Sequence, residues 1–159
     1  MTLSQELKTQ LANLSSFSTG EQVLEITHGT QRLSCHLVAL DSLACAFTRL
    51  ALQTESLSTR TSGELKQLAE SLSARLNYLL EPISPIELDA QGCVAQLRSN
   101  PPQKEEDRTS YYELLVSRSG ALSLTRYSRS AGQERQVIAA HVTREVLARL
   151  VADFAAVAP

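Results

Sequence analysis

The chain has 159 residues and a formal net charge of −2, a length that suits one domain built around one hydrophobic core. Aromatic residues make up 4% of the sequence and tryptophan is absent, so aromatic cages and base-stacking platforms are poorly supplied. The small negative charge provides no overall field that would attract nucleic acid or an anionic membrane. We therefore expect neither as a partner.

Signals for export or membrane insertion are not found in the sequence. The start, MTLSQELKTQ, has no basic segment followed by an apolar run, and no stretch offers about 20 consecutive apolar residues. Cys35, Cys45 and Cys93 are odd in number, widely spaced and flanked by apolar residues, a pattern typical of reduced, buried thiols. The sequence thus predicts a single cytoplasmic domain over residues 1–159.

The first predicted elements are a helix and a hairpin. The helix spans about residues 4–14, where leucines recur on one face and Thr2 with Gln5 fits a capping box. Alternation over 23–27 and 31–38 predicts two strands, with Gly29 between them in a left-handed conformation. The following run, LACAFTRLAL at 43–52, fits both helix and strand spacing, and we favour a third strand.

The clearest helix signal spans residues 62–80. Thr61 and Glu64 form a T-x-x-E capping box ahead of a leucine stripe, and a proline ends the pattern. Residues 83–88 and 93–99 then predict a second hairpin.

The loop of this second hairpin ends at Gly92, which we expect in a left-handed position. Two prolines and a run of charges follow the hairpin and indicate an exposed loop over about residues 100–109.

Residues 110–130 alternate on both sides of Ser119 and Gly120 and predict a third hairpin with these two residues at the centre of its turn. The opposing pairs expected from this turn are Leu115 with Leu124, Glu113 with Arg126, and Tyr112 with Tyr127. In this register Leu114 and Val116 share a face with both Tyr112 and Tyr127. Each face of the hairpin then carries apolar side chains, and one face is a candidate interface.

The last predicted elements are a strand over 135–139, after a turn at Gly132, and a helix whose N-cap is Thr143. The strands come as hairpins and lack the β-α-β rhythm of parallel sheets. The predicted fold class is therefore α+β, in the order α-β-β-(β)-α-β-β-β-β-α, with three helices packed against an antiparallel or mixed sheet.

Motifs for catalysis or ligand binding are scarce. His28, His36 and His141 lack metal-ligand spacing, and Cys35 and His36, as neighbours on a strand, point to opposite faces. The sequence also holds no nucleophile elbow, Walker loop or dinucleotide fingerprint. We therefore predict no catalytic residue, no metal site and no cofactor.

The most suggestive part of the sequence is the third hairpin, where tyrosines and arginines gather. Both residue types are frequent at protein interfaces. The candidate interaction surface consists of Tyr111, Tyr112, Arg118, Arg126, Tyr127 and Arg129. The alternative explanation is a solvated sheet surface with cross-strand Glu–Arg pairs, worth about 0.2–1 kcal/mol each.

The size, acidity and element order of the chain resemble those of the type III secretion chaperones, which are small homodimeric α+β proteins that bind extended segments of other proteins. This is a resemblance of fold rather than of motifs. It implies a non-enzymatic interaction module that forms a homodimer and presents a sheet face or edge strand to a protein partner.

Two other functions stay open at this stage. One is a small-molecule-binding or enzymatic domain with a pocket between the sheet and the helix over 62–80, and with His36, Cys93 or His141 near its mouth. The other is contact with nucleic acid through the arginines of the third hairpin, against which the net charge argues.

Overall fold

The computed structural model describes residues 1–159 and contains three helices and ten strands. The helices are α1 (Leu3–Asn13), α2 (Ser62–Arg75) and α3 (Arg144–Val157). The strands are β1 (Gln22–His28), β2 (Gln31–Leu40), β3 (Ala44–Thr54), β4 (Ile83–Asp89), β5 (Val94–Ser99), β6 (Gln103–Lys104), β7 (Arg108–Ser117), β8 (Ala121–Ser130), β9 (Gln136–Ile138) and β10 (Ala140–Thr143). A short 3-10 turn, Glu55–Leu57, links β3 to the segment before α2.

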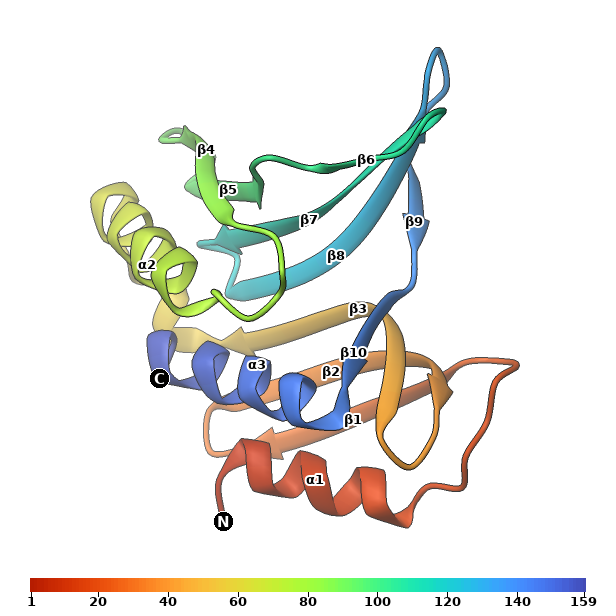
Figure 1. Cartoon of the computed structure of the whole chain (residues 1–159). Coiled ribbons are helices and arrows are strands. Elements are labelled where there is room, and N and C mark those ends of the chain that lie inside the picture. Colours follow the sequence, from red (N-terminus) through yellow and green to blue (C-terminus); the bar gives the residue numbers. More distant parts are fainter.

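The strands form one antiparallel sheet in the order β1-β2-β3-β8-β7-β5-β4, with β6, β9 and β10 attached alongside. Figure 1 shows α1, α2 and α3 on the same side of the sheet, which leaves the other side free of helices. α1 packs on β1 and α3, while α2 packs on β4 and β5. The predicted α+β class, with helices on an antiparallel sheet, is confirmed.

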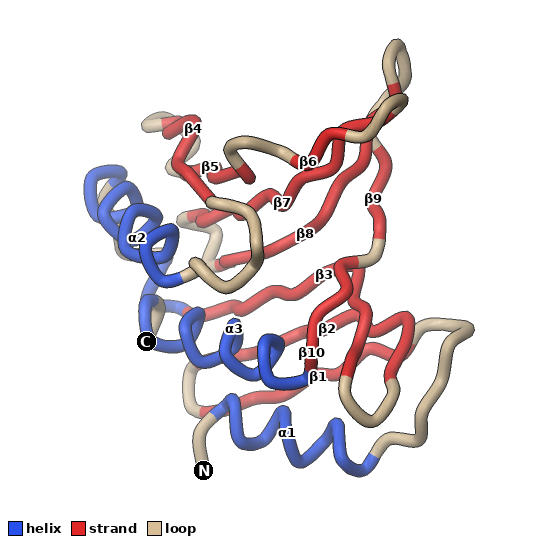
Figure 2. The backbone as a smooth tube through the Cα atoms, in the orientation of Figure 1, coloured by secondary structure: helices blue, strands red, loops and turns tan.

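The sheet divides between β3 and β8. β8 pairs with β3 only over residues 121–124. Farther along, β9 pairs with β8 at residues 126–128, and β10 pairs with β3 at residues 44–47. Figure 2 shows the chain running from β8 down to β3 through β9 and β10, into α3. These two short strands therefore fill the gap where the longer strands separate.

The core lies between the sheet and the helices and is mainly aliphatic. Because side chains alternate along a strand, every second residue of the central strands faces the helices. Cross-strand pairing joins such residues into a buried row that crosses the sheet from β1 to β5, made up of Leu24, Cys35, Leu50, Leu124, Leu114 and Leu97. All three cysteines are buried and free, as predicted.

The local signals that start the helices are confirmed. Thr2 with Gln5, and Thr61 with Glu64, each form the reciprocal hydrogen bonds of a capping box. Thr143 caps α3 by accepting a hydrogen bond from the backbone N–H of Val146. None of the helices is long and apolar enough to cross a membrane.

The first hairpin and the strand that follows it are confirmed as well. His28 pairs with Gln31, so Gly29 and Thr30 form a two-residue turn, in which Gly29 has the expected positive φ of 62°. The ambiguous run at 43–52 lies in β3 from Ala44 onward, because its alternate side chains complete the buried rows between β2 and β8.

α2 is shorter than the predicted helix over 62–80 because it ends at Arg75. Leu76 already leaves helical geometry, with φ −85° and ψ 51°. The next turn of chain is held by tertiary contacts, since the Tyr78 hydroxyl donates a 2.6 Å hydrogen bond to Asp153 of α3. The leucine spacing continues past the end of the helix, and for this reason the sequence pattern overestimates the length of the helix.

The prediction for Gly92 is wrong, because the residue with positive φ in this loop is Cys93, at 52°. Gly92 has a different role. The Asp89 side chain accepts hydrogen bonds from the backbone N–H groups of Gln91 and Gly92. A Cβ at Gly92 would lie 2.5 Å from Asp89 Oδ2. A larger residue would therefore clash with the Asp89 side chain, and the turn favours glycine.

The charged segment over 100–109 is largely exposed, as predicted, but it is not loop throughout. β6 pairs with Thr109 and Ser110, and β7 already begins at Arg108. The backbone N–H of Asn100 donates a 2.7 Å hydrogen bond to Pro82 O. This bond ties the start of the segment to the chain that follows α2.

Burial of the α2 leucine stripe predicts a large effect for Leu72→Ala, because Leu72 is fully buried in the core. The free energy of unfolding should fall by about 2–5 kcal/mol through lost transfer energy and a new cavity. Urea unfolding measures it. Ser71→Ala, at the adjacent exposed position, is the matched control and should change stability by less than about 0.5 kcal/mol. Equal effects of the two changes would contradict the placement of α2.

Candidate functional site

The β7–β8 hairpin has a register one residue away from the predicted one. Val116 pairs with Leu122, so the turn between them is longer than two residues. Gly120 N–H donates to Ser117 O, and Gly120 has a φ of 105°, as in a type I turn followed by a left-handed residue. The correct pairs are Tyr111 with Tyr127, Tyr112 with Arg126, Glu113 with Thr125 and Leu114 with Leu124.

This register divides the predicted interaction surface between two faces of the sheet. Tyr112 and Arg126 point toward the helices and are 5% and 9% exposed. Tyr111 and Tyr127 point to the helix-free face, so the expectation that Tyr112 and Tyr127 share a face is wrong. Arg118 lies in the turn, where it donates to Arg60 O.

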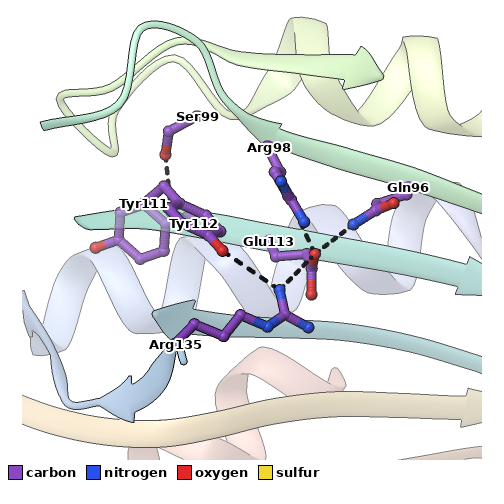
Figure 3. Close-up of polar contacts among 7 residues, drawn as sticks. All are labelled: Gln96, Arg98, Ser99, Tyr111, Tyr112, Glu113 and Arg135. Atoms are coloured by element: carbon purple, nitrogen blue, oxygen red, sulfur yellow. Dashed lines mark hydrogen bonds and ion pairs between the residues drawn. The ribbon is translucent and has the colours of Figure 1, made fainter. Parts of the chain in front are cut away.

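Glu113 is the centre of the polar contacts on the helix-free face. Its Oε1 accepts hydrogen bonds from Arg98 Nε at 3.2 Å, from Arg135 Nη1 at 3.0 Å and from the amide of Gln96. Figure 3 shows Gln96, Arg98 and Glu113 on neighbouring strands, with Arg135 reaching Glu113 from the segment just before β9 and helices behind. Glu113 is only 3% exposed although no helix covers it, because its neighbours enclose the carboxylate.

Two tyrosines extend this cluster into an aromatic and cationic array. The rings of Tyr111 and Tyr127 have centroids 6.0 Å apart. Arg135 lies 3.8 Å from the Tyr127 ring centroid, and Arg98 lies 4.9 Å from that of Tyr111. Such contacts contribute about 0.5–1 kcal/mol each where they are exposed. The array, defined as Gln96, Arg98, Tyr111, Glu113, Tyr127 and Arg135, is therefore held in a fixed arrangement.

The ionisation of the array follows from these contacts. Burial by itself raises the pKa of Glu113, but the hydrogen bonds from Arg135, Gln96 and Arg98 outweigh it and hold the pKa below its usual value. The hydrogen bond to Tyr111, followed by that to Glu113, raises the pKa of Arg135. Both groups are thus charged at neutral pH, and the two arginines share one carboxylate.

The positive charge extends beyond the array. Glu113 is the only acidic residue on β2, β3, β5, β7 and β8. The helix-free face of these strands, together with the segment before β9, carries Arg32, Arg49, Arg98, Arg129 and Arg135. Neither Arg32 nor Arg49 has a carboxylate within ion-pair distance. Acidic residues recur at the edges of the sheet, with Glu25 on β1, Glu87 and Asp89 on β4, and Glu21 just before β1 in contact with His36.

The other face of the hairpin borders a cleft of about 590 Å³ just beyond the end of α2. Its walls come from the chain after α2, from the proline-rich segment after β5 and from β9–β10, and it is lined by Leu79, Leu80, Glu81, Pro82, Pro101, Pro102, Gln103, Tyr112, Arg126, Ala139 and His141. Arg126 Nη2 bonds Glu81 Oε2 at 2.9 Å and Gln103 Oε1 at 3.1 Å. The Arg126 guanidinium also lies 4.5 Å from the Tyr112 ring centroid.

The cleft can be compared with the pocket expected for the alternative function, which stays a prediction. It lies next to the chain that follows α2, and His141 lines it, whereas His36 and Cys93 do not. His36 lies on the helix-free face and contacts Glu21 at 3.0 Å. No group of three or more histidine, cysteine or acidic side chains is placed to hold a metal ion.

Sequence reasoning missed most of the residues that complete these two sites. The sequence pattern places Gln96 and Arg98 only within a strand, and it makes no prediction for Glu81. An alternation argument applied to β5 would have placed Gln96 and Arg98 on one face. No sequence signal indicates that Glu81 meets Arg126, because the contact depends on how the chain turns after α2.

Comparisons with models of known protein families, with curated proteins and with solved structures found no match to this chain. The class that the structure defines is an α+β protein with an open antiparallel sheet, one face of which is covered by helices.

The enclosed carboxylate predicts a pH-dependent effect of Glu113→Gln. At pH 7 the substitution should lower the free energy of unfolding by about 1–2 kcal/mol, because charge-assisted hydrogen bonds are weakened. Since the folded-state pKa lies below the unfolded value of about 4.3, the stabilisation is complete above that value and disappears as the pH falls through the folded-state pKa. Urea unfolding at pH 7 and near pH 3 should show a large and a small difference, respectively.

The matched control is Glu87→Gln, on the edge strand β4, where the carboxylate is exposed. It should leave stability almost unchanged at both pH values. A Glu113→Gln effect that is the same at pH 7 and at pH 3 would contradict the role of the ionised carboxylate.

Proposed function

We infer that the chain is a non-enzymatic protein-interaction module, whose helix-free sheet face binds an acidic segment of a partner protein. The observation that carries this proposal is the excess of arginine over carboxylate on that face, arranged around the array of Tyr111, Tyr127 and Glu113. The whole chain has a net charge of −2, so the positive charge is a property of this face and not of the molecule as a whole.

The chemistry of the face favours a protein segment as its partner. Tyrosine and arginine are enriched at protein interfaces because they combine large contact areas with directed polar groups. Charge complementarity speeds association and selects partners. The guanidinium groups of Arg98 and Arg135 are held by Glu113 and by the tyrosine rings, so binding immobilises little further side-chain freedom.

Self-association is a separate proposal. Two copies that meet on their helix-free faces would bring arginines such as Arg49 and Arg129 near one another, and like charges in contact are unfavourable. A homodimer of the kind predicted from the sequence therefore has better candidates elsewhere, such as the edge strand β1, whose Val23 is 47% exposed.

The proposal predicts that a fluorescent Glu-rich peptide binds the protein at low salt and that a Lys-rich peptide of equal length does not. Arg49→Glu should weaken binding of the Glu-rich peptide about fivefold or more, because it replaces an attraction by a repulsion. Fluorescence anisotropy at two salt concentrations measures this, and binding should weaken as salt rises. Lys66→Glu, the same charge change on the exposed side of α2, is the matched control and should have little effect.

Equal binding of both peptides, or equal effects of the two substitutions, would refute the assignment of the face. An oligonucleotide that binds more tightly than the Glu-rich peptide would favour nucleic acid as the partner instead. Light scattering on the same samples reports whether the chain self-associates and whether Arg49→Glu changes that state.

A further inference from the structure

The cleft beyond α2 contains an ion pair that is only half satisfied. Glu81 Oε1 and Arg126 Nη1 are the buried side-chain nitrogen and oxygen atoms of this chain that have no hydrogen-bond partner. Both belong to the Glu81–Arg126 pair, which is joined through the other two atoms. Buried polar groups are nearly always satisfied, and leaving one without a partner costs about 1–3 kcal/mol. The arrangement therefore favours any occupant that supplies both missing partners.

The two unpartnered atoms require opposite kinds of hydrogen-bond partner. Arg126 Nη1 is a donor and requires an acceptor, whereas Glu81 Oε1 is an acceptor and requires a donor. A carboxylate would satisfy the arginine but would be repelled by Glu81, and an ammonium group would have the reverse problem. A carboxamide offers an acceptor oxygen and an N–H donor on one planar, neutral group.

Part of the lining is apolar, beside the polar side chains of Gln103 and His141. Pro82, Pro101 and Pro102 contribute apolar walls, and the Tyr112 ring lies against the Arg126 guanidinium at the polar end. The volume of about 590 Å³ is within the range of ligand sites. Leu80 lies at the cleft with 96% of its surface exposed and a φ of 66°, so contact with a ligand would bury an otherwise unpacked side chain.

We propose that this cleft binds a carboxamide attached to an apolar group, with the amide oxygen accepting from Arg126 Nη1 and the amide N–H donating to Glu81 Oε1. The site is separate from the helix-free face, because Arg126 and Tyr112 point to the opposite side of the hairpin from Tyr111 and Tyr127. Because both unpartnered atoms are enclosed, binding requires the residues at the cleft surface to move. The amide comes either from a small molecule or from the main chain of a peptide.

The test is a titration of the isotope-labelled full chain followed by two-dimensional NMR, with benzamide, benzoate and acetyl-pentaalanine N-methylamide, which has no primary carboxamide, as probes. Benzamide should cause saturable shifts at Leu80, Glu81 and His141 and should bind at least tenfold more tightly than benzoate. Binding of the alanine peptide at the same residues identifies a peptide main chain as the source of the amide, and binding of benzamide alone identifies a small molecule.

Glu81→Gln tests whether the negative charge of Glu81, and not only the shape of its side chain, causes the preference for benzamide. The glutamine keeps an acceptor but removes the negative charge, so the preference for benzamide over benzoate should fall at least tenfold. Glu87→Gln, an exposed position outside the cleft, should retain the wild-type preference. If Glu81→Gln fails to fold, Leu80→Ser provides the second variant: its side chain is already exposed, and it should weaken benzamide binding several-fold.

Three results would overturn the proposal. Equal binding of benzamide and benzoate to the wild-type chain would show that the cleft does not select a group that both donates and accepts a hydrogen bond. Shifts that map outside the cleft would place the ligand elsewhere. No saturable shift with any probe would mean that the Glu81–Arg126 pair is completed by a bridging water only. None of these results bears on the binding of acidic peptides to the helix-free face.

Discussion

The separation of β8 from β3 after Leu124 is the feature on which both candidate sites depend. Up to that residue the two strands share a ladder, and the buried leucine row continues across them. Beyond it, β8 curves away and pairs with β9 instead. The divergence leaves space on the helix side for the cleft, and it allows the chain before β9 to place Arg135 over Glu113 on the other side. Because β8 changes its pairing partner from β3 to β9, the β7–β8 hairpin borders the cleft on one side and carries the array on the other.

Side-chain alternation along β8 explains why two arginines of one strand have such different environments. Arg126 and Arg129 are both on β8, but alternation places them on opposite faces. Arg126 is enclosed beside Glu81 and Tyr112, where a charge needs a partner to offset its desolvation. Arg129 is exposed and donates only to Gln133 O. Residue type alone therefore does not indicate the environment of an arginine here, because the face of the strand determines it.

Much of the fold was predictable because its signals are local. Capping boxes, alternating strands and the glycine turn at Gly29 each depend on residues within a few positions of one another. The errors arose where distant contacts override a local pattern. Tyr78 bonds Asp153, and α2 ends earlier than its leucine spacing indicates. A third turn residue at 118–120 shifts the hairpin register by one and reverses which side chains share a face.

The sequence by itself determined the α+β class, the hairpins, the helix starts and the aliphatic core, because periodicity and capping are set by neighbouring residues. It also indicated the third hairpin as the place where tyrosines and arginines gather. Only the tertiary structure decided which of these residues act together. Glu113 meets Arg98 and Arg135, and Arg126 meets Glu81, through strand pairing and chain turns that join segments distant in sequence. Such contacts depend on the packing of the whole sheet, which no local pattern specifies.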